Sequence, residues 1–252
     1  MSKQKRLALV TGAAQGLGRA IAQRLADDGC SILMADIRYD DARRAVEEMN
    51  AAGHQAFALE LDVGNEQSVM QTYKEIASCH GRLDILVNNA GISGERAPVE
   101  TGSLEGWETT IRINLTGTFL MCRGAIPLMR RQQWGRIVNM SSLSARGQPG
   151  VTRSGYVASK AGIMGFSRVL ADEAGRDGIT VNCVAPSRIM TPMTIGTSGG
   201  SKEYWERGAA GSVLGRLGEP HEIAHAVGWL CSDQASFVTG TVIDVNGGTV
   251  MR

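Results

Sequence analysis

The chain has 252 residues, of which 43% are hydrophobic, and its 26 basic and 25 acidic residues leave a formal net charge of +1. This near-neutral balance argues against nucleic acid or an anionic membrane as a partner, because both are bound through excess positive charge. The five cysteines are scattered, with no C-x-x-C pair and no clustered histidines, which argues against a metal site and predicts reduced thiols in a cytoplasmic compartment.

In the first part of the chain, apolar strands alternate with helical patterns. Only four apolar residues follow the polar N-terminal segment, too few for a secretory signal, and no apolar run is long enough to span a membrane. The alternation predicts strands at residues 7–10, 31–35, 56–61 and 83–87, a helix ending at Gly29, and helices at 41–52 and 66–78. Such alternation is typical of parallel strands joined by right-handed crossovers.

The second part continues the alternation of strands and helices, except between residues 187 and 218. It predicts a long helix at 107–129, a strand at 136–140, a helix at 156–175, a strand at 180–185, a helix at 219–231 and a last strand at 241–245. The stretch between 187 and 218, with flexible glycine and serine at 197–201, is expected to be a loop that covers the substrate. We therefore expect one α/β domain over residues 1–252, a Rossmann-type doubly wound sheet of about seven parallel strands with helices on both faces.

The segment Thr11-Gly12-Ala13-Ala14-Gln15-Gly16-Leu17-Gly18 joins the first strand to the first helix. Its glycines permit a tight turn, and the helix N-terminus offers free N–H groups to a pyrophosphate. The spacing departs from the common G-x-G-x-x-G, and a glycine-rich turn alone is equally typical of a plain strand-to-helix connection. We interpret it as a dinucleotide-binding turn because Asp36 follows at the end of the second strand.

Asp36 stands roughly twenty residues after the turn, where a carboxylate can accept hydrogen bonds from the adenosine ribose. The same carboxylate repels a 2′-phosphate, so the sequence favours NAD over NADP. Arg38 is a complication, because a guanidinium nearby can pair with that phosphate. Asp36 is also compatible with a helix cap or a solvated turn.

Tyr156 and Lys160 are spaced i, i+4 in a predicted helix, so both side chains lie on one face. A tyrosine of ordinary pKa is a slow base at neutral pH, and a neighbouring ammonium is expected to lower that pKa. Most Tyr-x-x-x-Lys pairs are surface residues, so the assignment depends on context, here the preceding strand that ends in Asn139-Met140-Ser141-Ser142.

With these motifs in order, the chain resembles the short-chain dehydrogenase/reductase family, in its compact single-domain branch. The resemblance covers essentially the whole chain and rests on the glycine turn, Asp62-Val63, Asn88-Asn89-Ala90-Gly91, Asn114, Ser142, Tyr156 and Lys160. It implies that Ser142 binds the substrate oxygen, Tyr156 exchanges a proton with it, Lys160 also holds the nicotinamide ribose, and Asn114 holds a water of a proton relay. The cofactor-binding residues it implies are Gly12, Gln15, Gly16, Leu17, Gly18, Asp36, Asp62, Val63, Asn89, Ala90, Gly91, Tyr156, Lys160, Pro186, Ile189 and Thr191.

Some of these assignments leave alternatives open. Asn88 to Gly91 also fits a plain turn that braces the sheet, and Asn114 also fits a helix-distorting asparagine without chemistry. Ser142 is chosen over Ser141 and Ser144 as the second serine of its pair, and its interval to Tyr156 is one residue longer than in many relatives, an addition assigned to the loop between 146 and 153. Tyr204 and Trp205 fit either a substrate-pocket wall or anchors of the covering loop.

Ser187 occupies a position where the family usually has glycine, which puts the local turn in doubt, because serine lacks the freedom of glycine at positive φ.

The substrate classes that fit are secondary alcohols and ketones, polyols, and 3-oxoacyl thioesters. Two residues favour a small alcohol or ketone over the thioester of an acyl carrier protein. Asp36 favours NAD, and Gln15 stands where similar acyl reductases carry a basic residue. Other possibilities are a non-catalytic dinucleotide-binding regulator and an isomerase, epimerase or dehydratase on the same scaffold. The resemblance also implies a homotetramer.

Overall fold

The computed structural model describes residues 5–147, 153–199 and 201–251. Within these residues, seven strands form one parallel sheet in the order β3-β2-β1-β4-β5-β6-β7. The strands are β1 (Leu7–Thr11), β2 (Ser31–Asp36), β3 (Ala56–Glu60), β4 (Ile85–Asn88), β5 (Gly135–Met140), β6 (Ile179–Pro186) and β7 (Val242–Val245). The direction of strand order reverses between β1 and β4, which is where doubly wound sheets open a ligand crevice.

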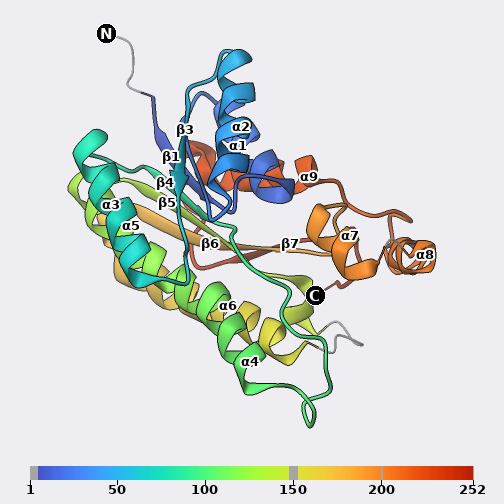
Figure 1. The fold of residues 1–252 in the computed structure, drawn as a ribbon. Coiled ribbons are helices and arrows are strands. Elements are labelled where there is room, and N and C mark those ends of the chain that lie inside the picture. Colours follow the sequence, from blue (N-terminus) through green and yellow to red (C-terminus); the bar gives the residue numbers. More distant parts are fainter. Residues whose placement is uncertain (1–4, 148–152, 200, 252) are drawn as a thin grey trace.

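Helices cover both faces of the sheet (Figure 1). They are α1 (Gly16–Asp27), α2 (Tyr39–Ala51), α3 (Glu66–Cys79), α4 (Leu104–Ile111), α5 (Gly117–Arg131), α6 (Ser154–Ala174), α7 (Pro192–Ser198), α8 (Lys202–Ala210) and α9 (Pro220–Cys231). One face packs against α1, α2 and α9 and the other against α3, α5 and α6, which gives two large apolar clusters separated by the sheet. The predicted Rossmann-type doubly wound fold is confirmed.

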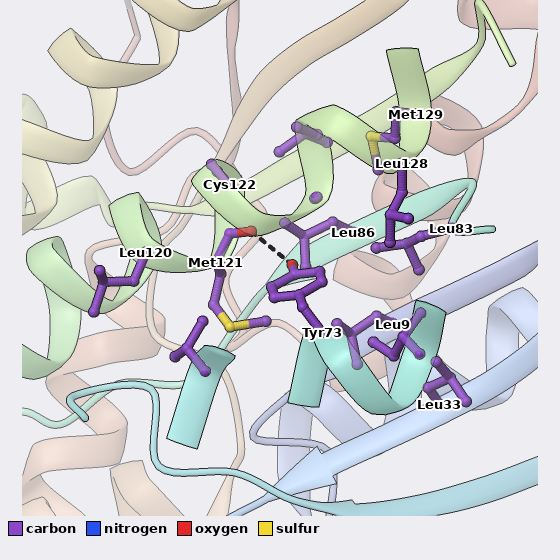
Figure 2. Packing of buried hydrophobic residues seen from close by; sticks show 14 of the residues in the cluster. Leu9, Leu33, Tyr73, Leu83, Leu86, Leu120, Met121, Cys122, Leu128 and Met129 are labelled. Carbon is purple, nitrogen blue, oxygen red and sulfur yellow. Dashed lines mark hydrogen bonds between the residues drawn. The ribbon is translucent and has the colours of Figure 1, made fainter. Parts of the chain in front are cut away.

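The cluster under α3 and α5 includes a buried polar group with its own partner (Figure 2). The Tyr73 hydroxyl donates to the Met121 carbonyl at 2.6 Å, so the phenol enters the core without an unpaired donor. The ring lies against α5 at Gly124, where a Cβ would stand only 2.2 Å from a ring carbon. A side chain at position 124 would therefore force the two helices apart.

Two sequence predictions need correction in this fold. The helix predicted at 107–129 is interrupted, because α4 and α5 are joined by a π-helical turn at Arg112–Thr116. The region predicted as a loop at 187–218 contains α7 and α8, whose first turns are capped by the side chains of Thr191 and Ser201. These caps satisfy free N–H groups and stabilise short helices that hydrophobic periodicity does not reveal. In the described part of the chain, no helix is both long and apolar enough to cross a membrane.

Candidate active site

A cavity of about 430 Å³ lies at the carboxyl ends of the parallel strands. It begins at the glycine turn after β1 and extends to Tyr156 at the start of α6. Every residue that the sequence analysis assigned to the site lines it, apart from Asn114. The lining residues that sequence reasoning did not assign are Ile37, Arg38, Leu61, Ile92, Ile113, Met140, Ser141, Ser187, Pro192, Met193 and Thr194, many of them direct neighbours of assigned residues.

The glycine turn leaves the N-terminus of α1 available to a ligand. Gln15 is the N-cap residue, but its side chain makes no capping hydrogen bond, and the first turn of α1 contains no acidic residue. The first N–H groups and the positive end of the helix dipole therefore lack a competing side-chain acceptor. At Gly18 a Cβ would stand 2.1 Å from the Gly12 carbonyl oxygen, so the turn closes this tightly only with glycine. These are the properties of an anion-binding turn.

Asn89 supports this turn from the end of β4. Its side-chain amide donates to the Thr11 and Gly12 carbonyl oxygens at 2.9 and 3.0 Å, and its backbone N–H donates to the Thr11 hydroxyl at 3.0 Å. Asn89 lines the cavity, yet its amide hydrogens are committed to the protein. The contacts of Asn89 therefore hold the glycine turn in place.

Asp36 is buried at the end of β2 and lines the same end of the cavity. One carboxylate oxygen accepts the Ala14 N–H and the other accepts the Arg38 N–H, both at 3.0 Å. Each oxygen retains capacity for a further hydrogen bond, because a carboxylate offers about four acceptor sites. Asp62 and Val63 follow β3 beside it, and Asp62 accepts the Gly64 N–H at 2.9 Å.

Ser142, Tyr156 and Lys160 meet at the opposite end of the cavity. The Ser142 side chain is close enough to Tyr156 to lower the pKa of its hydroxyl, and the Lys160 ammonium lies 5.8 Å from the centre of the Tyr156 ring. The Ser141 hydroxyl instead donates to the Lys160 carbonyl at 2.8 Å and so connects β5 to α6. The Ser141 hydroxyl is thus engaged by the backbone of α6, and the choice of Ser142 over Ser141 stays a prediction.

The electrostatics of this end differ from the sequence expectation. Burial raises the pKa of Tyr156 above its ordinary value, while the hydrogen bond with Ser142 and the charge of Arg153 act in the opposite direction. Burial also lowers the pKa of Lys160, to about 8, and its ammonium donates to the Met140 carbonyl at 2.7 Å. The pKa of Tyr156 is therefore raised in the protein by itself, opposite to the lowering expected from the sequence, because burial outweighs the effects that lower it.

Asn114 lies behind the cavity, at the centre of the π-helical turn, and is fully buried. Its side-chain oxygen accepts the Ile92 N–H at 2.8 Å, and its amide donates to the Ile92 carbonyl and the Ser159 hydroxyl at 3.0 and 3.1 Å. It thus connects the segment after β4 to α6 beside Lys160. A π turn inside an α-helix often occurs at a functional site.

The segment after β6 forms the remaining wall. Ser187 has no positive φ, so serine in place of glycine causes no strain there. Ile189 and Thr191 line the cavity, and Pro192, Met193 and Thr194 at the start of α7 lie beside them. Tyr204 and Trp205, on α8, form an edge-to-face pair with ring centres 5.2 Å apart, and neither lines the cavity. Within the described residues, no group of three or more His, Cys, Asp or Glu side chains is placed to hold a metal ion.

A parallel doubly wound sheet, a glycine turn with an acidic residue after the second strand, and a Tyr-Lys pair at one cavity define the class of nicotinamide-dependent oxidoreductases. A family model described as "Enoyl-(Acyl carrier protein) reductase" matches residues 12–250. The chain belongs to the short-chain dehydrogenase/reductase family.

Similar proteins extend over nearly the whole chain. The 3-oxoacyl-[acyl-carrier-protein] reductase FabG of Aquifex aeolicus is 40% identical over 247 residues, 97% of both chains. The (2S)-[(R)-hydroxy(phenyl)methyl]succinyl-CoA dehydrogenase subunit BbsD of Thauera aromatica is 41% identical over 249 residues, 98% of both. The structure of a short-chain type dehydrogenase/reductase from Mycobacterium ulcerans superposes with a TM-score of 0.92 at 31% identity, and covers 99% of this chain and 91% of that one.

Proposed function

We propose that this enzyme interconverts a secondary alcohol and its ketone, with NAD as the cofactor and Tyr156 as the general acid and base. The observation that carries the proposal is the position of Tyr156. It lines the cavity beside Ser142 and Lys160, at the opposite end from Asp36. A dinucleotide with its adenosine at Asp36 can extend along the cavity and reach Tyr156.

The residues present fit such a cofactor. The uncapped N-terminus of α1 suits the pyrophosphate, and the buried carboxylate of Asp36 keeps acceptor sites for the ribose hydroxyls. Lys160 suits the nicotinamide ribose at the other end. The remaining contacts are assigned to Gly12, Gln15, Gly16, Leu17, Gly18, Asp62, Val63, Asn89, Ala90, Gly91, Tyr156, Pro186, Ile189 and Thr191, all of which line the cavity. When bound, the nicotinamide accepts or supplies the hydride, and its oxidised ring adds a positive charge that favours the phenolate.

The preference for NAD rests on the surroundings of Asp36. A buried carboxylate at this position opposes a 2′-phosphate by charge repulsion. Arg38, the residue that could offset it, has its guanidinium 3.2 Å from Asp41 and 3.8 Å from Asp36. Because that guanidinium already faces two carboxylates, a phosphate would have to displace it from them.

In the proposed reaction Ser142 holds the substrate oxygen and Tyr156 takes its proton during oxidation, or returns one during reduction. The position of Tyr156 beside Ser142 orients its hydroxyl toward the shared oxygen. Lys160 is a cation held rigidly by the Met140 carbonyl, and Asn114 fixes the neighbouring backbone. We assign Asn114 a positioning role and retain the proposal that its turn holds a water of the proton relay.

A screen of secondary alcohols, polyols and ketones with both cofactors, followed through the absorbance of the reduced nicotinamide, tests the proposal. Tyr156→Phe is expected to lower kcat by at least about 100-fold, because it removes the group that transfers the proton, while the dissociation constant of NADH stays within about threefold. Near-normal turnover by this variant would refute the assignment of Tyr156. Cofactor binding without turnover of any substrate would favour a regulator, and substrate conversion without net change in the nicotinamide would favour an isomerase or dehydratase.

The 3-oxoacyl thioester is the second candidate substrate, and the specific observation in its favour is the 40% identity to a 3-oxoacyl-[acyl-carrier-protein] reductase. The arrangement at Asp36 argues for an NAD-linked enzyme, whereas reductive biosynthesis usually draws on NADPH. Acetoacetyl thioesters therefore belong in the same screen, with both reduced cofactors. Efficient NADPH-dependent reduction would establish this second function.

We also propose that the chain acts as one domain in a cytoplasmic homotetramer, and that the region 187–218 covers the substrate. Large apolar side chains are exposed on the outer helices, among them Leu104 and Trp107 of α4, Phe119 of α5 and Val169 of α6. Such surfaces are costly in water and are typical of subunit interfaces. Light scattering after size-exclusion chromatography would measure the assembly directly.

A further inference from the structure

Arg38 lines the cavity together with Asp36, at the end assigned to the adenosine of the cofactor. Its backbone is held from both sides. The Arg38 N–H donates to the Asp36 carboxylate at 3.0 Å, and the Arg38 carbonyl accepts the N–H groups of Asp41 and Ala42, both at 3.1 Å, where α2 begins. Because the backbone is fixed, the rotamer of the long side chain decides which group the guanidinium meets.

The guanidinium of Arg38 lies between two carboxylates. Its Nε is 3.8 Å from Asp36, and its terminal Nη1 is 3.2 Å from Asp41, in the first turn of α2. Asp41, the partner in the closer contact, does not line the cavity. The other oxygen of the Asp41 carboxylate pairs with Arg44, so this carboxylate bridges two arginines. The terminal Nη1 of Arg38 is thus directed to α2.

This orientation bears on the cofactor, because a phosphate on the adenosine ribose would lie next to Asp36. A guanidinium that donates to such a phosphate offsets the repulsion between the phosphate and the Asp36 carboxylate. Arg38 supplies a guanidinium at this end of the cavity. To donate its terminal groups to the phosphate, Arg38 has to leave Asp41, so the phosphate competes with that carboxylate. Asp41 therefore opposes NADP without touching it.

We infer that Asp41 is a specificity-determining residue, which holds the Arg38 guanidinium against α2 and so withholds it from a 2′-phosphate. This inference rests on the proposed function, in which Asp36 binds the ribose of NAD. It assigns part of the discrimination against NADP to a residue outside the cavity. Asp36 repels the phosphate directly, whereas Asp41 acts through Arg38. Removing the charge of Asp41 should therefore ease NADP binding even when Asp36 is retained.

The test measures cofactor binding and needs no substrate. The fluorescence of the reduced nicotinamide gives the dissociation constants of NADPH and NADH, and the ratio of the first to the second is the readout. Asp41→Asn should lower this ratio about fivefold or more, because the released Arg38 can pair with the phosphate. The dissociation constant of NADH should stay within about twofold. The matched control is Asp40→Asn, in the same first turn of α2. Asp40 lies 3.9 Å from Arg43, and its substitution should change the ratio less than about twofold.

A double-mutant cycle with Arg38→Gln separates the release of Arg38 from the simple removal of a negative charge. In the wild-type background Arg38→Gln should change the ratio less than about twofold, because Asp41 already occupies the guanidinium. In the Asp41→Asn background the same substitution should raise the ratio about fivefold or more. Asp41→Ser should show the same coupling and guards against an effect of asparagine on the start of α2. An unchanged ratio in both Asp41 variants, or equal effects of Arg38→Gln in all backgrounds, would overturn the inference.

The outcomes separate the inference from the proposed function. NADH binding without coupling between positions 38 and 41 refutes the inference and leaves the NAD-linked chemistry intact. A wild-type enzyme that binds NADPH more tightly than NADH refutes the NAD assignment of the proposed function, and the coupling still decides the inference. Failure of the wild type to bind either nucleotide refutes both.

Discussion

Lys160 is expected to reduce the stability of the fold that positions it. Its side chain is buried, with the residue 6% exposed, and burial lowers its pKa from 10.5 to about 8. At pH 7 the residue is protonated in both the folded and the unfolded chain, so the full cost of burying the charge is present. This lowering of the Lys160 pKa corresponds to a loss of about 3 kcal/mol of unfolding free energy.

Replacing Lys160 with methionine, which is similar in length and neutral, removes this cost. It also removes the hydrogen bond to the Met140 carbonyl, a loss of about 1–2 kcal/mol. Lys160→Met should therefore be more stable than the wild type at pH 7 by about 1–2 kcal/mol, which raises Tm by about 2–6 °C for a chain of this size. The same variant should lose nearly all turnover.

The stability difference between Lys160→Met and the wild type should depend on pH. As pH rises above 8, folded Lys160 loses its proton before the unfolded lysine does, so the wild-type penalty declines and is absent above about pH 10.5. The stability advantage of Lys160→Met should therefore shrink between pH 8 and 10. Buried cysteines with raised pKa values also destabilise the fold as pH rises in this range. The contributions of Cys30, Cys122 and Cys231 cancel in the difference, whereas that of Cys183 does not, because the charge of Lys160 acts on its thiol.

Thermal and urea unfolding of both proteins at pH 7 and pH 9.5 measure these quantities. Lys74→Met, at an exposed position on α3, is the control and should change stability by less than about 0.5 kcal/mol. A Lys160→Met variant less stable than the wild type at pH 7, or an advantage that stays constant up to pH 9.5, would refute the reasoning.

Three further predictions concern the cofactor, the turn after Ser142 and the core. Asp36→Ala should reduce the ratio of kcat/KM with NAD to kcat/KM with NADP by at least about tenfold. The control Glu60→Ala, at the exposed partner position of Asp36 in the β2–β3 register, should leave this ratio unchanged. An unchanged ratio in Asp36→Ala would remove the basis for the NAD preference. Arg146→Gln breaks the pair with Asp244 and loosens the turn after Ser142, so it should lower kcat/KM about tenfold at nearly constant NADH affinity. The control Arg123→Gln, which breaks an exposed pair with Glu66, should leave kcat/KM unchanged. Equal losses in the two variants would contradict a positioning role for Arg146. Gly124→Ala should destabilise the fold by about 1–2 kcal/mol, because its Cβ would overlap the Tyr73 ring, whereas Gly175→Ala, in helical backbone with open space around it, should be neutral or stabilising by up to about 1 kcal/mol in urea unfolding.

The sequence predicted the sheet well, because buried parallel strands and amphipathic helices leave strong local patterns. Each predicted strand lies within two residues of the observed one, and the glycine turn and Asp36 meet at one cavity as expected. The sequence left open a helix-distorting role for Asn114 but did not predict the π-helical turn itself, since the turn is stabilised by contacts of Asn114 with Ile92 and Ser159, distant in sequence. Local periodicity does not report such contacts.

Other parts of the site also depended on three-dimensional information. The direction in which the Lys160 ammonium points follows from the carbonyl of Met140, twenty residues away, and the raised pKa of Tyr156 follows from its burial in the folded chain. The amide of Asn89 is committed to the glycine turn, a contact that spans most of the first half of the chain. The residue added between Ser142 and Tyr156 was assigned to a loop whose residues 148–152 lie outside the described part of the chain.

The π-helical turn has a consequence for how this enzyme tolerates changes of length. One residue more than an α-helical turn requires is accommodated between α4 and α5, and each residue of an α-helix rotates the following side chains by about 100°. Because the π turn absorbs this residue, the α4 contacts with α6 and the α5 contacts with the sheet keep their phase. Deleting one residue from Arg112–Thr116 would restore regular helix geometry but would remove the widened turn that holds Asn114 against Ile92 and Ser159. The length of the turn is therefore constrained by the position that it gives Asn114.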